Sequence, residues 1–197
     1  EKNGFIKVEF SDISRLMAES LVERRYVSPL FVKESLPHAL FLNEPCNLAV
    51  MVCEEDHLRI QCIQPGLSLK DAYEGAEKIE GLFDSAFELS FEERLGYLTA
   101  CPTNIGTAMR ASVMLALPVL TEMGRLESAA KRLESMGLIL RGMFGEGSGA
   151  MGGLYQVSNR REPGVSESEI LEQREETLSA AIEKAVGCRN YLKDLLR

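Results

Sequence analysis

Along this chain, short apolar runs alternate with longer stretches in which apolar residues recur every three or four positions. The first pattern predicts β-strands, and the second predicts amphipathic helices. The predicted strands are residues 38–43, 48–53, 58–64, one that follows 91–95 and ends near 99, 111–117, 138–144 and 154–158. The predicted helices are residues 5–26, 69–86, 118–136 and one long helix that begins at 166.

Capping residues support the helix boundaries. They are Ser11 or Asp12, Ser68, Pro118, Gly137, and the pair Ser166 and Glu169, which has the spacing of a capping box. The strands come in consecutive groups joined by short turns, which favours antiparallel pairing. The fold class that we predict is therefore α+β, with a largely antiparallel β-sheet flanked by helices. We expect one main domain over residues 1–164, and a C-terminal helix over 165–197 for packing or dimerisation.

Composition narrows the function classes. The chain has 197 residues and a formal net charge of −8, which disfavours nucleic acid as the main partner because phosphate binding needs a basic face. No apolar run approaches the length of a membrane span. The five cysteines contain no C-x-x-C pair, so neither a disulfide framework nor a zinc site is indicated. These features favour a globular protein of a reducing cytoplasm.

The stretch from Cys101 to Met114 is the centre of the candidate chemistry. Pro102, Asn104 and Gly106 predict an irregular loop between two apolar runs, and Arg110 stands where the second run begins. Such a loop suits a site that holds an anion in a fixed geometry. Structural loops also contain these residue types, so the loop alone is a weak signal.

Three arginines, Arg59, Arg110 and Arg141, each stand at or beside the end of a predicted strand. If the sheet brings them together, they form a clamp for a polyphosphate, because a guanidinium matches phosphate oxygens with two parallel hydrogen bonds. The alternative interpretation is a set of ordinary surface ion pairs.

Carboxylates and a cysteine give a second set of candidates. Residues 54–56 are Glu-Glu-Asp, and together with Glu146 they suit the binding of a planar cation such as a guanidinium, although a run of this kind is more often a solvated turn. Cys101 begins the central loop and becomes a nucleophile only as a thiolate, whereas most free cysteines are small buried apolar residues. His57 is more typical of a structural residue than of a base, and the glycines between 145 and 153 match no complete nucleotide fingerprint.

Four segments together resemble the ATP:guanidino phosphotransferases, the family of arginine and creatine kinases. They are Glu-Glu-Asp-His-Leu-Arg at 54–59, Gly-Tyr-Leu-Thr-Ala-Cys-Pro-Thr-Asn-Ile-Gly-Thr-Ala-Met-Arg-Ala-Ser-Val at 96–113, Arg-Gly-Met-Phe-Gly-Glu at 141–146 and Gly-Gly-Leu-Tyr-Gln-Val-Ser-Asn at 152–159. The sequence is most similar to the bacterial protein-arginine kinases of this family. Met114 stands where kinases of small guanidines usually have a histidine.

The resemblance implies a role for each matching residue. Glu55 and Glu146 would hold the target guanidinium, and Cys101 would lie beside it as a third catalytic residue. Arg59, Arg110 and Arg141 would hold the phosphates of ATP. The remaining nucleotide-site residues would be Ala111, Ser112, Val113, Met114, Gly142, Met143, Phe144 and Gly145. Mg²⁺ would be bound mainly through the phosphates of ATP, so no protein metal ligand is expected.

The implied activity is transfer of the ATP γ-phosphate to arginine side chains of proteins, linked to degradation by a Clp protease. Protein substrates bearing arginine are the implied partners, and the resemblance also allows an activator protein, the Clp protease and a homodimer. The family's N-terminal Ser-x-Arg-x-Arg pattern and its later Arg-Asp-x-x-Arg-Ala motif have no match here. A fragment, a natural short form and a catalytically impaired regulatory module that binds arginine or phosphoarginine therefore stay open. A kinase of free guanidines is a third alternative.

Overall fold

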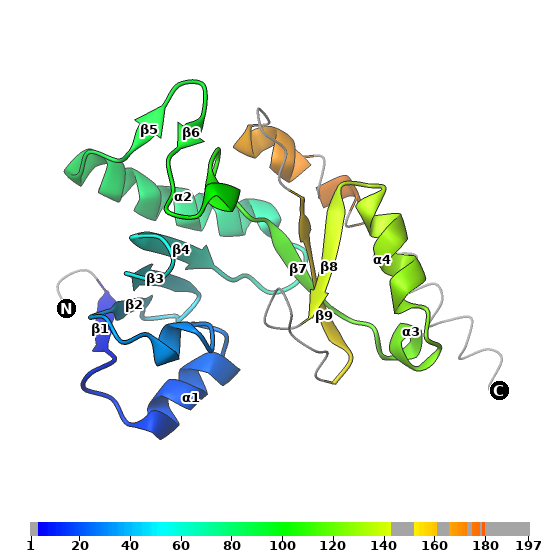
Figure 1. Cartoon of the computed structure of the whole chain (residues 1–197), viewed down its shortest axis with the longest axis horizontal. Coiled ribbons are helices and arrows are strands. Elements are labelled where there is room, and N and C mark those ends of the chain that lie inside the picture. The colour runs from blue at the N-terminus through cyan, green and yellow to red at the C-terminus, as the bar shows by residue number, and fades with distance from the viewer. Residues whose placement is uncertain (1–3, 143–151, 161–165, 173–174, 178, 180–197) are drawn as a thin grey trace. The chain divides into compact units, whose positions relative to one another are not determined.

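The structure, a computed structural model, describes residues 4–142, 152–160, 166–172, 175–177 and 179 of the chain (Figure 1). The chain divides into two compact units, Glu1–Ala108 and Met109–Arg197. Each unit has its own antiparallel sheet with helices packed against it, so the predicted α+β class is confirmed. No helix in the described part of the chain combines the length and apolar character that crossing a membrane requires.

The first unit is built on a four-stranded sheet whose strands follow one another in chain order. These strands are β1 (Phe5–Glu9), β2 (Ala39–Asn43), β3 (Leu48–Val52) and β4 (Leu58–Cys62), and every neighbouring pair is antiparallel. The meander predicted for 38–64 is therefore confirmed. Its core side is apolar, since Leu40 and Met51 are almost completely buried and Phe31 packs beside them.

The prediction of one helix over residues 5–26 is wrong in its first part. Residues 5–9 form β1, which pairs with β2 along its whole length. The sequence Phe-Ile-Lys-Val-Glu fits a half-exposed edge strand, and its pairing with β2 stabilises the strand over the helix that the sequence predicted. Helix α1 (Arg15–Glu23) begins only after Ser14, whose hydroxyl accepts a hydrogen bond from the Met17 amide. Ser14 is therefore the N-cap, in place of Ser11 or Asp12.

Helix α2 (Leu69–Ala86) follows Ser68 and packs on β4, so the prediction for 69–86 is confirmed. The Ser68 hydroxyl donates to the carbonyl of Pro65 and does not cap the helix through its side chain. Two short strands follow, β5 (Phe91–Glu92) and β6 (Gly96–Tyr97), and then the 3₁₀ turn η2 (Pro102–Asn104). Backbone hydrogen bonds between Tyr97 and Gly106 close this loop against β6.

The second unit contains a three-stranded antiparallel sheet in the order β7 (Ser112–Ala116), β9 (Leu154–Asn159), β8 (Leu138–Gly142). The helix predicted for 118–136 is two helices, α3 (Pro118–Glu122) and α4 (Leu126–Glu134). The break falls at Gly124, whose φ of 61° is left-handed and cannot continue an α-helix. Helix α4 packs on β8, and Leu138 and Val157 are fully buried in the sheet.

The start of the last predicted helix is confirmed. The Ser166 amide and hydroxyl both donate to the Glu169 carboxylate, and the Glu169 amide donates back to the Ser166 hydroxyl. This reciprocal arrangement is a capping box. Residues 167–172 are helical, while 180–197 lie outside the described residues. The proposed division of the chain at residue 164 stays a prediction.

Candidate functional site

The loop between β3 and β4 carries three consecutive carboxylates in a tight turn. The Cys53 amide donates to the His57 carbonyl at 3.0 Å, which closes the turn, and Cys53 has a φ of 59°. The side chains of residues 54–56 have different partners: Glu54 bonds within its own loop, whereas Glu55 and Asp56 both reach the Asn104 side chain. Their partners show which of them is directed to solvent.

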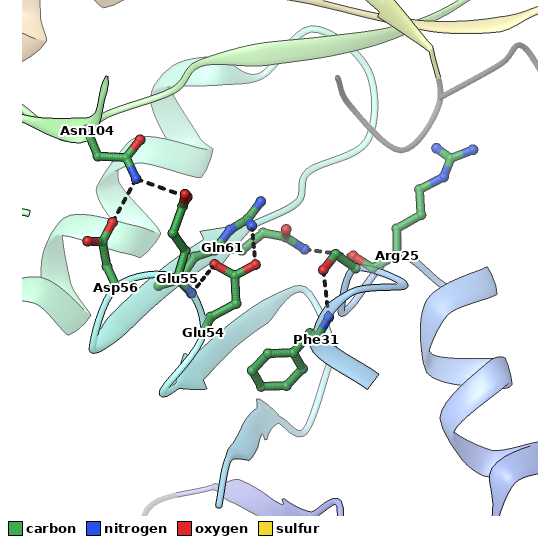
Figure 2. Close-up of polar contacts among 9 residues, drawn as sticks. Arg25, Phe31, Glu54, Glu55, Asp56, Gln61 and Asn104 are labelled. Atoms are coloured by element: carbon green, nitrogen blue, oxygen red, sulfur yellow. Dashed lines mark hydrogen bonds and ion pairs between the residues drawn. The ribbon is translucent and has the colours of Figure 1, made fainter. Parts of the chain in front are cut away.

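Asp56 fixes this loop to the segment that contains Cys101. One carboxylate oxygen accepts a hydrogen bond from the Ala100 amide at 2.6 Å, and the other accepts from the Asn104 side-chain amide at 2.7 Å. Figure 2 shows Asn104 directed between the carboxylates of Asp56 and Glu55. The bonds join residues 44 and 48 positions apart in the sequence. Asp56 is therefore a structural link between the acidic loop and the cysteine loop.

Glu55 is exposed, and its Oε2 is 3.4 Å from the same Asn104 nitrogen. The neighbouring Glu54 points back into its own loop, where it accepts from the Glu55 amide and pairs with the Arg59 guanidinium at 3.1 Å. Of the three carboxylates, Glu55 is therefore the one presented to solvent with the weakest internal bond. Such a carboxylate is suited to accept hydrogen bonds from a guanidinium.

Cys101 lies at the other side of the Asp56 link. It precedes η2, and the Thr99 hydroxyl donates to its carbonyl at 2.7 Å. Its Sγ is 3.0 Å from the Thr103 hydroxyl, and the residue is half-buried. Thus the first unit holds Glu55 and Cys101 on two loops that Asp56 and Asn104 join, and Arg59 lies in β4 directly after the first of these loops. The roles that the sequence predicts for these residues stay predictions.

In the second unit, one face of the sheet has polar side chains. In the sheet register Ser112 stands opposite Ser158, and Gln156 stands opposite both Met114 and Arg141, so all five residues share a face. The Gln156 amide donates to the Ser112 hydroxyl at 2.7 Å, and the Arg141 guanidinium donates to the Ser158 hydroxyl at 2.9 Å. This bond restricts the orientation of the Arg141 guanidinium, and the phosphate-binding role predicted for Arg141 stays a prediction.

Arg110 is exposed and stands two residues before β7. The buried side chain of Asn159 accepts from the Ala111 amide at 2.9 Å and donates to the Met109 carbonyl at 3.5 Å. The backbone on both sides of Arg110 is therefore held by one side chain. Ala111 is itself buried, and Ser112, Val113 and Met114 form the start of β7.

Some of the predicted site cannot be placed. Glu146, Met143, Phe144 and Gly145 lie outside the described residues, whereas Gly142 is the last residue of β8. Arg59 belongs to the first unit, and Arg110 and Arg141 belong to the second, so the predicted cluster of three arginines stays a prediction. In the described part of the chain, no three residues among His, Cys, Asp and Glu gather as metal ligands.

The sequence reasoning did not identify the residues that hold the candidates in place. The sequence indicated Asn104 only as a loop-forming residue, Ser158 and Asn159 only as parts of a resembling segment, and Asp56 only as one of a run of acids. Each acts on a partner between 17 and 50 residues away. Spacing along the chain carries no signal for such contacts. The one available signal was that buried asparagine and serine side chains need hydrogen-bond partners.

Comparison with known proteins shows which family this chain is similar to. Residues 1–185 match the family model described as ATP:guanido phosphotransferase, C-terminal catalytic domain. The protein-arginine kinase of Brevibacillus brevis is 40% identical over 190 residues, which are 96% of this chain and 53% of that protein. The protein-arginine kinase of Staphylococcus epidermidis is 45% identical over 172 residues, which are 87% of this chain and 51% of that protein. The chain thus spans about half the length of these curated relatives.

A solved structure gives the same result. The duplicated taurocyamine kinase from Schistosoma mansoni, with bound transition state analog components, superposes with a TM-score of 0.79 at 26% sequence identity. The match covers 92% of this chain and 26% of that one. Together with the family model, these matches confirm the resemblance that the four sequence segments indicated.

Proposed function

Because this chain belongs to the ATP:guanido phosphotransferase family, we propose that it is the catalytic part of a protein-arginine kinase, which transfers the γ-phosphate of ATP to arginine side chains of proteins. The names of its 40–45% identical relatives favour protein arginine over a free guanidine. The observation that carries the proposal is the exposed Glu55 carboxylate, which Asn104 and the Asp56 link hold beside the Cys101 loop.

The proposed reaction uses Glu55 in two ways. Its carboxylate accepts hydrogen bonds from the target guanidinium and so fixes the direction of the attacking nitrogen. That nitrogen forms a bond to the γ-phosphorus while the bond from the γ-phosphorus to the β,γ-bridging oxygen breaks and ADP leaves. The proton that the nitrogen loses passes to Glu55. Cys101 lies beside the guanidinium, and Glu146 is the second carboxylate of the proposed clamp.

The arginines supply the electrostatic part of catalysis. Arg59, Arg110 and Arg141 hold the phosphates and stabilise the charge that develops on the transferred group. The sheet face that bears Ser112 and Met114 lines the nucleotide, as do residues 142–145. ATP supplies the phosphoryl group, and Mg²⁺ would be held mainly through the phosphates of ATP and would offset their negative charge, since Mg²⁺ often uses few protein ligands in such sites. The proteins phosphorylated on arginine would then be degraded by a Clp protease. An activator protein and a second copy of the chain are further proposed partners.

The test is phosphoryl transfer from γ-labelled ATP to an unstructured arginine-rich protein and, separately, to free arginine. We expect acid-labile label on the protein, and its loss in Glu55→Gln, which keeps the shape of the side chain but removes the proton acceptor. Glu93→Gln is the matched control, because Glu93 is an exposed glutamate away from the acidic loop. This control should keep full activity.

Two other results would change the assignment. If arginine peptides bind to the chain but no label is transferred, the chain is a binding or regulatory module of the family. If free arginine is labelled faster than the protein, the chain is a kinase of small guanidines. Label that persists in Glu55→Gln would contradict the role given to that carboxylate.

A further inference from the structure

The last two residues of β9, Ser158 and Asn159, are the polar residues among the buried side chains of the described chain. They point to opposite faces of the sheet, as consecutive strand residues do. Ser158 is 0% exposed and Asn159 is 5% exposed. Burying a hydroxyl and an amide is unfavourable unless each is hydrogen-bonded. The hydrogen-bond partners of Ser158 and Asn159 therefore indicate the roles of these two residues.

Asn159 acts on the backbone that carries Arg110. Its side-chain oxygen accepts from the Ala111 amide at 2.9 Å, its side-chain nitrogen donates to the Met109 carbonyl at 3.5 Å, and its own amide donates to the Ala111 carbonyl at 3.1 Å. Two of these bonds fix the peptide units before and after Arg110, and the third fixes the next peptide unit, at the Ala111 carbonyl. The Cα of Arg110 is held against the end of β9, although its side chain is exposed.

Ser158 acts on the other arginine of this unit. Its hydroxyl oxygen accepts from Nη1 of Arg141 at 2.9 Å across the strand pair β8–β9. A guanidinium has five N–H donors in a rigid plane, so this one bond restricts the orientation of the whole group. Because Ser158 is buried in the sheet, this bond ties the Arg141 guanidinium to a fixed point of β9.

We propose that Ser158 and Asn159 are positioning residues for a polyphosphate site. Ser158 orients the Arg141 guanidinium, and Asn159 fixes the backbone from which the Arg110 side chain extends. This inference deepens the proposed function, on which it rests. Holding the Arg141 guanidinium and the backbone of Arg110 in place before the ligand arrives lowers the cost of ordering them at the moment of binding. One dipeptide controls both arginines because β9 is the central strand of the sheet.

The experiment measures binding of ATP and of inorganic tripolyphosphate to the whole chain by calorimetry. We expect Ser158→Ala and Asn159→Ala each to weaken tripolyphosphate binding about tenfold, the size of one lost charge-assisted contact. Ser158→Thr keeps the hydroxyl and should bind tripolyphosphate more tightly than Ser158→Ala does. Thr121→Val is the matched control, since the Thr121 hydroxyl bonds to the Leu117 carbonyl and the Tyr155 hydroxyl in the same unit.

A double-mutant cycle separates positioning from general stability. In an Arg141→Ala background, Ser158→Ala should weaken binding less than about twofold further, and Asn159→Ala should do the same in an Arg110→Ala background. The full tenfold loss in these backgrounds would overturn the inference, because the residues would then act without the arginines. So would a wild-type chain that binds no tripolyphosphate.

If Asn159→Ala does not fold, hydrogen exchange of the Ala111 amide in the wild-type chain tests the role of Asn159 instead. Tripolyphosphate should slow this exchange, and no change would overturn the inference. A chain that binds tripolyphosphate and gives the expected double-mutant cycle, but transfers no phosphoryl group, would contradict only the proposed kinase activity. The two proposals therefore fail in distinguishable ways.

Discussion

At the scale of single residues, the candidate guanidinium site depends on Asp56 as much as on Glu55. Glu55 is exposed, whereas both oxygens of Asp56 are occupied by donors of the cysteine loop. Charge-assisted hydrogen bonds of this length are among the stronger ones in proteins. The position of the Cys101 loop relative to Glu55 therefore depends on a residue that need not touch the substrate.

Asp56→Asn should destabilise the first unit by about 1 kcal/mol, because the new amide places a donor opposite the Asn104 donor. Urea unfolding measures this loss, and Asp84→Asn, an exposed change on α2, is the control. The same variant should lower phosphoryl transfer while ATP binding is kept. Equal stability of Asp56→Asn and Asp84→Asn would show that the link contributes nothing.

Gly96 is required by the same loop for a steric reason. Its φ is 77°, and a Cβ added there would lie 2.5 Å from the carbonyl oxygen of Gly106. Gly96→Ala should therefore cost about 1–3 kcal/mol beyond the backbone strain alone. Gly66→Ala is the matched control, because Gly66 has a φ of 74° but open space around its Cβ position. Thermal unfolding of both variants gives the difference, and equal melting temperatures would contradict it.

At the scale of elements, the sequence predicted strands better than it predicted where helices begin and break. Residues 38–64 were assigned correctly because alternating apolar runs and turn residues agree there. Residues 5–9 were misassigned because five residues are too few to distinguish the helical period of about 3.6 from the strand period of about 2. Their pairing with β2 is what makes them a strand. The break between α3 and α4 was missed because one glycine within a helical pattern is usually tolerated.

For the candidate site, the sequence could name candidate residues but not the residues that hold them in place. Glu55, Arg59, Cys101 and Arg110 could be named from motifs in continuous segments. The residues that hold them could not, because Asp56 bonds to Ala100 and Asn159 bonds to Ala111 over distances of 44 and 48 residues. Such contacts arise only from the register of the folded sheets and loops.

The capping box at Ser166 makes the start of the last helix dependent on pH. The Ser166 amide and hydroxyl lower the pKa of Glu169 below its usual value of about 4.3, because both donors favour the ionised carboxylate. The stabilisation is therefore present above that usual value and is lost as the pH falls through the lowered pKa. An NMR titration of the Glu169 carboxyl should give a midpoint below about 4.3. In Glu169→Gln, the Ser166 amide should show no such transition, and a midpoint at or above the usual value would contradict the effect.

At the scale of the whole molecule, the net charge bears on the protein substrate that we propose. A formal charge of −8 attracts a basic, arginine-bearing protein over a distance set by the ionic strength. The screening length falls from about 30 Å at 0.01 M to about 10 Å at 0.1 M salt. Exposed charges far from the site therefore act mainly at low salt.

Raising the ionic strength across this range should slow the labelling of a basic protein several-fold, through a lower association rate. A neutral peptide with one arginine serves as the control, and its labelling should change much less. Initial rates at low substrate concentration are the measurement. Equal salt dependence for both substrates would show that the overall charge has no part in substrate capture.

The strand order of the second unit has a consequence for how the protein is made. β9 is the central strand of its sheet, yet it is the last of the three in the chain. As the ribosome releases the chain from its N-terminus, β7 and β8 lack their partner in this sheet until β9 emerges, an interval on the order of seconds. Over that interval, two strands that will flank a common neighbour have unpaired edges, which other chains can bind. Synthesis that pauses before residue 154 should therefore recruit chaperones to the nascent chain.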